Sequence, residues 1–517
     1  MPGRESSRTG THERAVPPSI VAAGNENGAP QTVDICPISA HLRARDGLCR
    51  DPQAGRHGGR QRDIGAGMFA NEQTDAQQRI SLKLKERRSI LTGAAALIFQ
   101  REFNPRENQM RTSLYKEAPT DFAQRAGSDP HSSSAPLALK RVIRPEEIRE
   151  NLPAGQGGVG FLFHATDWDT LSFSFHNVKH RNASFEEELW RTEPFIASPI
   201  YSASQVIGAN IACPVPLELW LGSPRGIKRF RETQFFPALE LAKQAGLNMV
   251  AMGASTPYAC NYGALPRHTK PPHITTGHAA TAAMLKDWAV HCCNELDLEF
   301  GKTKLALFGA AGRLGTTVAK YMLYKDAPKE LVLIDLPDKA NLLAEQAREL
   351  LAADLLGKTR VSVHTFSPDT PLPQFDGAIL ASSTSVPYLT AADLKRAQFW
   401  IDDSHPRAAS VEAELASRDH TLYIECFARG PAGLDTTFPF RLPTTRDCYT
   451  CFAEGYAAWQ EGIASDFIIG SPPVWSVSYT HGLLKKYGFS VGPFHGKDGS
   501  PIVLDAQHRG KHELMGS

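Results

Sequence analysis

Apolar and polar residues follow two different patterns along this chain of 517 residues. Up to about residue 135 the sequence is polar, is rich in Gly, Ser, Arg and Pro, and has no helical or strand periodicity. Such a segment cannot bury enough apolar surface to offset the entropy of an ordered chain. The pattern therefore predicts a largely disordered N-terminal extension over residues 1–138.

A globular pattern begins at about Leu139. Residues 158–164 form a short apolar run typical of a buried strand. Residues 235–246 have helical spacing, and residues 247–253 form the next apolar run. This alternation predicts an α/β substrate-binding domain over residues 139–285.

Six apolar runs then follow at regular spacing, with helical or loop segments between them. Strands that alternate with helices in this way form a parallel sheet with helices on both faces. The pattern predicts a doubly wound, parallel Rossmann sheet within residues 286–440 and a C-terminal helical segment over residues 441–517 with a flexible end. The strands are expected at residues 304–308, 331–335, 359–365, 376–381, 398–402 and 420–425.

The first of these strands ends in a glycine-rich loop, Gly309-Ala-Ala-Gly-Arg-Leu-Gly315. In a dinucleotide-binding turn, the first glycine permits a tight turn, the second lets the backbone approach a pyrophosphate, and the third lets the helix pack on the sheet. The helix N-terminus adds free N–H groups. An acid 20 residues later accepts hydrogen bonds from ribose hydroxyls. The predicted NAD or NADP site consists of Gly309, Ala311, Gly312, Arg313, Leu314, Gly315 and Asp335.

Charge and composition argue against several classes of partner. Lys plus Arg (56) nearly balances Asp plus Glu (55), so no overall field attracts nucleic acid. No apolar run is long enough for a membrane-spanning helix. The nine cysteines are scattered, as in a reduced cytoplasmic protein. Arg87 and Arg88 before a short apolar run resemble an export signal, but the run is internal, so a cytoplasmic location is expected.

Two cysteines lie near the start of a helix predicted over residues 445–459. Thr444 and Asp447 have the spacing of a capping box, and the helix dipole favours a thiolate in the first turns. Cys451 is therefore a candidate nucleophile, although a packed, buried cysteine is the simpler interpretation of the residues alone. Cys448 and Cys451 lack the second pair that a zinc site needs, so no metal is predicted.

Three segments in a fixed order carry a resemblance to a known family. They are Ile274-Thr-Thr-Gly-His278, the glycine-rich loop and Cys451-Phe-Ala-Glu454. Together they resemble the cyanobacterial-type long-chain acyl-(acyl carrier protein) reductases over about residues 158–490. The resemblance implies that Cys451 forms an acyl-enzyme from an acyl carrier protein or CoA thioester. It also implies that a reduced nicotinamide then releases a fatty aldehyde.

Other residues receive roles in this hypothesis. Glu454 lies one turn beyond Cys451 and is expected to orient or protonate the substrate, the alternative being a carboxylate on the helix surface. His405 follows a sheet strand and is expected to act as a general acid, the alternative being a loop histidine in solvent. Thr275, Thr276 and His278 are expected to face the cleft, although helix capping explains the two threonines as well.

The chain also departs from the family. Asp335-Leu336 replaces an arginine-containing segment that suits the 2′-phosphate of NADP, so NAD is favoured, while Lys339 leaves NADP open. Two alternatives remain. One is an NAD-dependent dehydrogenase of a small carbonyl or imine, of the shikimate or amino-acid type, without covalent catalysis. The other is a nucleotide-sensing protein whose N-terminal segment binds a partner. Each of these functions is compatible with a homo-oligomer.

Overall fold

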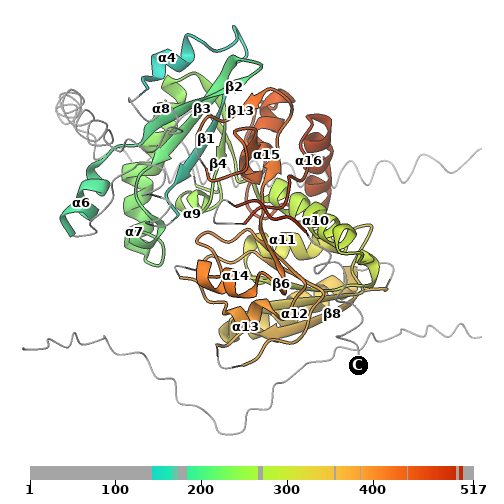
Figure 1. Ribbon diagram of the computed structural model, residues 1–517. Helices are drawn as coiled ribbons and strands as arrows, with labels where there is room; N and C mark the ends of the chain where they lie inside the picture. Colours follow the sequence, from blue (N-terminus) through green and yellow to red (C-terminus); the bar gives the residue numbers. More distant parts are fainter. Residues whose placement is uncertain are drawn as a thin grey trace, which may run out of the picture.

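The described part of the chain folds around two six-stranded sheets (Figure 1). The computed structural model describes residues 143–504, except for residues 167, 169–170, 172–182, 266–271, 354–356, 369, 385, 439 and 497–499. The N-terminal extension predicted over residues 1–138 lies outside the described residues, as does the end of the chain at residues 505–517.

The first sheet comes mainly from the α/β region that precedes the glycine-rich loop. Its strand order is β13-β2-β3-β1-β4-β5. Strands β3, β1, β4 and β5 run parallel, while β2 and β13 are antiparallel to their neighbours. The strands are β1 (Gly158–His164), β2 (Phe195–Ser202), β3 (Gln205–Cys213), β4 (Leu247–Met252), β5 (His273–Thr275) and β13 (Leu434–Asp435). The strands predicted at residues 158–164 and 247–253 are confirmed.

Helices cover both faces of this sheet. Side chains along β1 alternate between the two faces, and each face packs in a separate hydrophobic core. Val159, Phe161 and Phe163 enter one core, and Leu162 enters the core on the other face. The second of these cores contains α8, which confirms the helix predicted at residues 235–246. The helices of this unit are α4 (Pro145–Arg149), α6 (Ala183–Arg191), α7 (Pro224–Phe230), α8 (Phe236–Gln244) and α9 (Thr256–Ala259).

The second sheet has the strand order β11-β10-β9-β6-β7-β8, and all of its neighbouring strands are parallel. The order reverses between β6 and β9, and such a reversal opens a crevice at the carboxyl edge of a doubly wound sheet. The predicted Rossmann sheet is therefore confirmed. Its elements are β6 (Lys304–Phe308), α11 (Arg313–Met322), β7 (Glu330–Asp335), α12 (Ala340–Ala353), β8 (Arg360–Thr365), β9 (Gly377–Leu380), α13 (Ala391–Leu394), β10 (Phe399–Asp402), α14 (Val411–Ser417) and β11 (Leu422–Glu425).

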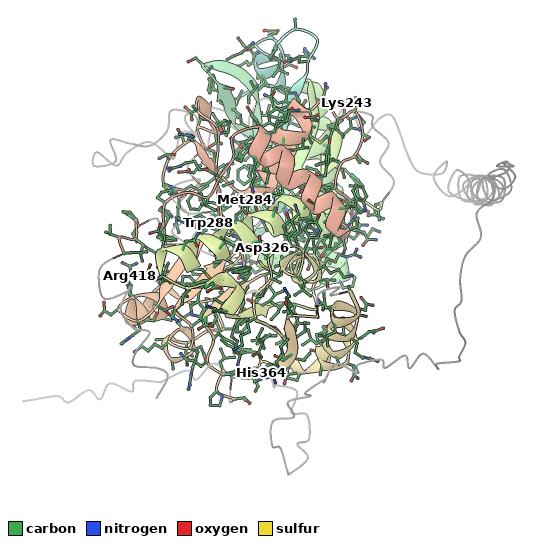
Figure 2. All side chains as sticks on the ribbon, turned by 90° about the vertical axis from the view of Figure 1, so that its right-hand side faces the viewer. Lys243, Met284, Trp288, Asp326, His364 and Arg418 are labelled. Atoms are coloured by element: carbon green, nitrogen blue, oxygen red, sulfur yellow. The ribbon has the colours of Figure 1, made fainter. Side chains whose placement is uncertain are left out.

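One long helix, α10 (His278–Glu295), belongs to the cores of both units. Met284 packs in the core that contains α15 and the first sheet, whereas Trp288, one turn later, packs in a core of the second sheet (Figure 2). The Trp288 indole N–H also donates to the Phe427 carbonyl at 2.8 Å. Because one buried helix contributes side chains to both cores along its length, α10 fixes the two sheets relative to each other.

After the second sheet the chain returns to the first (Figure 1). The short strand β13 pairs with the edge strand β2, although residues 434–435 lie within the range predicted for the Rossmann unit. Helix α15 (Thr450–Gln460) then packs on β1, β4, β5 and α10. Helix α16 (Val474–Lys486) packs on α10, α11 and α15. The C-terminal helices thus cover the first sheet and end beside the second.

The helix predicted over residues 445–459 begins later than expected. Thr444 donates to the Asp447 carboxylate from its backbone N–H at 3.0 Å, which is one half of a capping box. Its hydroxyl also donates to that carboxylate at 2.9 Å, and the Asp447 N–H donates to the Thr444 carbonyl at 3.0 Å. Asp447 also accepts from the Arg429 guanidinium, and the chain continues into β14 (Asp447–Cys448), which pairs with β12 (Ala428–Arg429). These contacts stabilise a loop and a short strand, and α15 begins at Thr450.

Alanine substitutions at two helical glycines, one on α15 and one on α16, are expected to change the stability of the protein in opposite directions. A Cβ at Gly455 would lie 2.6 Å from the Ala251 Cβ, so Gly455→Ala is expected to lower the free energy of unfolding by about 1–3 kcal/mol through overpacking. A Cβ at Gly482 on α16 would meet no atom within 4 Å, so Gly482→Ala is expected to raise it by up to about 1 kcal/mol. Urea denaturation measures both, and equal effects would contradict the close packing of α15.

Candidate functional site

A cavity of about 690 Å³ lies at the carboxyl edges of both sheets. Its lining includes residues that end or follow β1, β4 and β5 of the first sheet and β6, β7, β9 and β10 of the second. The first residues of α10, α11 and α15 also reach it. The cavity therefore joins the predicted nucleotide loop to the segment that carries Cys451.

The glycine-rich loop has the geometry that its sequence predicts. Gly309 adopts a left-handed φ of +72°, and a Cβ there would lie 2.5 Å from the Ala381 carbonyl oxygen. A Cβ at Gly315 would lie 2.1 Å from the Gly309 carbonyl oxygen, so only glycine allows this approach. Gly312 is the N-cap of α11. Gly309, Ala311, Gly312, Arg313 and Leu314 line the cavity, while Gly315 is buried where the helix packs on the loop.

Asp335, at the end of β7, lies beside this loop in the cavity wall. One carboxylate oxygen accepts from the Ala311 N–H and the other from the Leu336 N–H, both at 2.9 Å. The acid therefore fixes the loop as well as facing the cavity. Lys339 lines the same end of the cavity, so the structure retains both groups that bear on the choice between NAD and NADP.

Cys451 is the second residue of α15 and lines the cavity. Six of the seven cysteines that the structure describes are buried, and Cys451 alone among them is partly exposed. The backbone of Gly277 lies against it, since a Cβ at Gly277 would be 2.2 Å from the Cys451 Cβ. Cys448 is buried in β14 and does not line the cavity within the described residues.

The prediction that the helix dipole favours a Cys451 thiolate meets an opposing effect. Burial raises the pKa of the Cys451 thiol to about 12, and the nearby Asp403 carboxylate adds to the rise. Desolvation penalises the charged form of a thiol more than one helix terminus can offset here. In the structure as it stands, Cys451 is therefore protonated at neutral pH.

Glu454 does not face the cavity beside Cys451, where a residue that orients or protonates the substrate was expected. It is fully buried and is not among the described residues that line the cavity. Its carboxylate accepts from the Gly277 N–H at 2.7 Å, from the Ala280 N–H at 2.8 Å and from the Thr275 hydroxyl. Glu454 thus caps α10 from α15 and holds the segment that follows β5 against Cys451. A carboxylate on the helix surface is excluded as well.

His405 lies in the loop after β10 and lines the cavity. Its ring meets the Tyr449 ring edge to face, with centroids 5.3 Å apart. The buried Asp402 carboxylate organises this loop, because it accepts from the Ser404 N–H at 2.7 Å, from the Ala408 N–H at 3.1 Å and from the Tyr423 hydroxyl. His405 is therefore a cavity residue on an ordered loop rather than a histidine in bulk solvent.

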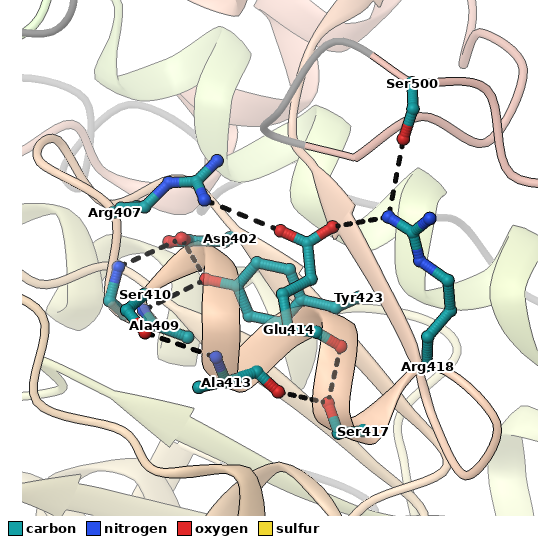
Figure 3. Close-up of polar contacts among 11 residues, drawn as sticks. Asp402, Arg407, Ala409, Ser410, Ala413, Glu414, Ser417, Arg418, Tyr423 and Ser500 are labelled. Carbon is teal, nitrogen blue, oxygen red and sulfur yellow. Dashed lines mark hydrogen bonds and ion pairs between the residues drawn. The ribbon is translucent and has the colours of Figure 1, made fainter.

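The same loop carries a charged network that the sequence did not reveal (Figure 3). Arg407 lines the cavity, and its guanidinium lies 3.6 Å from the buried carboxylate of Glu414. Arg418 approaches the other Glu414 oxygen at 3.3 Å. Arginine needs an anionic partner when it is partly buried, and Glu414 supplies one for two guanidinium groups.

Of the three residues expected to face the cleft, Thr276 and His278 line the cavity, and Thr275 is buried against Glu454. The His278 Nδ1 lies 3.1 Å from the Gly470 carbonyl oxygen, which fixes Nδ1 as the donor and leaves Nε2 as an acceptor. Burial lowers the pKa of His278 to about 4, with a smaller contribution from Arg313. The imidazole is therefore neutral over the physiological range.

An aromatic wall borders the cavity beside Cys451. Phe161, Phe163, Phe440 and Tyr449 all line it, and neighbouring rings in this set have centroids 5.2–5.8 Å apart. This wall could not be predicted from sequence because its members come from β1 and from residues on either side of β14. The alternating Phe161 and Phe163 were its only local signal.

Metal-binding clusters and membrane-spanning helices are both absent from the described residues. No group of three or more His, Cys, Asp and Glu side chains within them is arranged to hold a metal ion. None of the helices that the structure describes combines the length and apolar character needed to cross a membrane.

Comparisons with known proteins give structural matches alone. No protein-family model matches the sequence, and no curated protein sequence does so either. The chain is similar to L-tryptophan dehydrogenase from Nostoc punctiforme, at 12% identity over 64% of this chain and 81% of that chain, with a TM-score of 0.29. It is also similar to the hetero-hexameric glutamate dehydrogenase from Thermus thermophilus, at 12% identity over 64% and 74%, with a TM-score of 0.31. The assignment of the Rossmann fold rests on the strand order itself.

The environment of Glu454 predicts a pH-dependent contribution to stability. Burial raises the pKa of this carboxyl group from 4.5 to about 7, against the hydrogen bonds from Thr275, Ala280, Gly277 and Ala279 that lower it. A raised pKa means that the folded state binds the proton more tightly than the unfolded state. The resulting stabilisation is present below about pH 4.5 and is lost as the pH rises through about 7.

Glu454→Gln should remove this dependence, because the amide does not titrate. Between pH 8 and pH 5 the wild type is expected to gain stability relative to Glu454→Gln, by up to about 3 kcal/mol. Chemical denaturation of both proteins at each pH measures the difference. Parallel pH profiles would show that the carboxyl group titrates normally.

Proposed function

We propose that this protein is an NAD(P)-dependent oxidoreductase that reduces an acyl thioester to an aldehyde through an acyl group on Cys451. The observation that carries the proposal is that Cys451 and the dinucleotide loop line one cavity at the carboxyl edges of the two sheets. The acyl donor in this proposal is an acyl carrier protein or CoA thioester.

The first proposed step is acyl transfer to Cys451. The thiol loses its proton as its sulfur attacks the thioester carbonyl, the bond to the carrier sulfur breaks, and the carrier leaves as a thiol after taking up a proton. A bound NADH or NADPH would supply a hydride to the carbonyl carbon of the acyl-enzyme. The carbon–sulfur bond then breaks, which releases the aldehyde and the Cys451 thiolate; the thiolate takes up a proton from solvent, and the nicotinamide leaves in its oxidised form.

Because burial raises the pKa of the Cys451 thiol to about 12, this sequence needs a nearby proton acceptor. Three histidines line the cavity, His164, His278 and His405. The His164 Nε2 already accepts from the Ser255 N–H at 3.1 Å, and its Nδ1 donates to the Ala165 carbonyl at 2.7 Å. With its pKa lowered to about 4, His278 is a weak base. We therefore assign proton transfer to His405, which takes the thiol proton and returns it to the leaving carrier sulfur.

The aromatic wall supports an apolar acyl group. Phe161, Phe163 and Phe440 present ring surface to the cavity next to Tyr449, the residue before α15. An acyl chain that extends from Cys451 along this wall would bury apolar surface, which favours binding by roughly 25 cal/mol for each Å² removed from water.

One observation favours a second candidate, the direct reduction of a small carbonyl or imine. The Asp403 carboxylate and the raised pKa of Cys451 suit a neutral, unreactive thiol better than a nucleophile. In this alternative His405 transfers a proton directly to the substrate, and Cys451 contributes only to the cavity wall.

Intact mass spectrometry distinguishes the two candidates. After incubation with a range of acyl-CoA thioesters without nicotinamide, the wild type is expected to gain one acyl mass, and Cys451→Ala is expected to gain none. Cys448→Ala is the matched control, because Cys448 is buried three residues earlier and should leave the adduct unchanged. Addition of NADH or NADPH should discharge the adduct as aldehyde. No adduct at any chain length would favour the direct reduction.

The position of Asp335 predicts a preference for NADH. A carboxylate in the cavity wall accepts hydrogen bonds from a free ribose hydroxyl and repels a 2′-phosphate. Asp335→Asn keeps an acceptor for the Ala311 N–H but removes the charge, so it should shift the ratio of the two dissociation constants toward NADPH by roughly tenfold. Fluorescence titration measures both constants. Glu349→Gln, on the exposed side of α12, is the control, and an unchanged ratio in Asp335→Asn would refute the assignment.

A further inference from the structure

The ring of Tyr262 spans the cleft between the two units. Tyr262 belongs to the loop after α9 of the first unit and is 8% exposed. On one side its ring centroid lies 4.3 Å from the Cζ of Arg313, the first residue of α11 in the second unit. On another side its centroid lies 5.4 Å from that of His278. All three residues line the cavity.

The loop holds this ring in place at a conformational cost. Asn261 and Tyr262 have φ angles of +48° and +56°, in the left-handed region that residues other than glycine rarely adopt. The Tyr262 N–H donates to the Pro257 carbonyl at 2.7 Å, and the Tyr262 carbonyl accepts from the Gly470 N–H at 2.9 Å. Strained backbone that its surroundings hold in this way is typical of ligand clamps.

Arg313 is suited to an anionic ligand. It follows the N-cap of α11, at the helix end where backbone N–H groups are free and the dipole is positive. In the part of the chain that the structure describes, its guanidinium forms no ion pair. Stacking on Tyr262 occupies one face of the guanidinium, while its N–H donors lie in the plane and stay available for phosphate oxygens.

His278 completes the arrangement without adding a second cation. Its pKa is lowered to about 4, so the imidazole on the ring of Tyr262 is neutral when a dinucleotide binds at physiological pH. The positive charge at this point of the cavity is therefore that of Arg313, whose guanidinium lies over the ring of a residue from the other unit.

We propose that Tyr262 is a positioning residue for the dinucleotide phosphates, which acts from the first unit by holding the Arg313 guanidinium over the N-terminus of α11. This inference rests on the proposed use of NADH or NADPH. It assigns part of the cofactor affinity to a residue outside the Rossmann sheet, and it requires the face of the ring rather than the hydroxyl of Tyr262.

A double-mutant cycle on cofactor binding tests the inference. The dissociation constants of NADH and NADPH are measured by fluorescence titration for the full chain and for each variant. Tyr262→Phe keeps the ring and should bind within about twofold of the wild type, whereas Tyr262→Leu should bind roughly fivefold more weakly. Arg313→Met should lose about tenfold, and the double variant Arg313→Met with Tyr262→Leu should be no weaker than Arg313→Met alone.

Two further variants keep the test sharp. Arg313→Lys retains the charge but not the planar face, so it should lose about as much as Tyr262→Leu, and it leaves the Tyr262 loop unaltered. Lys320→Met removes a cation from the same helix where it pairs with Glu349, and it should leave binding unchanged. Melting temperatures confirm that each variant is folded.

The possible results separate the inference from the proposed function. If Tyr262→Leu and Arg313→Lys bind like the wild type, or if Tyr262→Leu weakens binding equally in the Arg313→Met background, Tyr262 does not act through Arg313 and the inference is overturned alone. If the wild type binds neither NADH nor NADPH, the proposed function fails together with the inference.

Discussion

The capping of α10 by Glu454 is the contact on which the site depends. A carboxylate from α15 accepts two backbone N–H groups at the start of α10, and the two segments are more than 170 residues apart in sequence. The same contact places Gly277 directly against Cys451. Since α10 also belongs to the cores of both sheets, this cap positions the candidate nucleophile relative to the nucleotide loop as well as to the first sheet.

Burial raises the pKa of both Cys451 and Glu454 on α15 and so favours the neutral form of each. Glu454 has lost its contact with water, and hydrogen bonds to its carboxylate limit the rise of its pKa to about 7. Cys451 has fewer compensating contacts and faces the Asp403 carboxylate, and its thiol pKa rises to about 12. A site that must exclude water from an acyl-enzyme therefore makes its own nucleophile harder to ionise, and this is why the proposed chemistry depends on His405.

The second sheet could be predicted closely from sequence, and the reason is local. Each of its strands is a short apolar run, and Gly309 and Gly315 occupy positions where a Cβ would collide with backbone. The start of α15 was predicted wrongly because the spacing of Thr444 and Asp447 fits a capping box, whereas both Thr444 groups donate to the Asp447 carboxylate within a loop. The pairing of Leu434 with Ser202 depends on an edge strand more than 200 residues away, which no local pattern encodes.

The site residues whose roles could not be predicted from sequence are those whose positions depend on contacts between distant parts of the chain. Tyr262 adopts a left-handed backbone conformation that nothing in its own sequence favours, and its ring meets Arg313 only because α10 holds the two units together. The sequence predicts a catalytic role for Glu454 because this residue lies one turn beyond Cys451. In the structure its carboxylate accepts hydrogen bonds from Thr275 at the end of β5 and from the first N–H groups of α10, so it caps α10.

Three helix N-termini converge on the cavity, and the structure gives each a different use. Glu454 occupies the N-terminus of α10 and neutralises its positive end. The N-terminus of α11 lies under Arg313 and the glycine-rich loop, where the proposed phosphates bind. The N-terminus of α15 carries Cys451, where negative charge develops in the proposed acyl transfer. Because Glu454 already occupies the first of these helix ends, the N-termini of α11 and α15 are the two that remain for the proposed phosphates and the proposed acyl transfer.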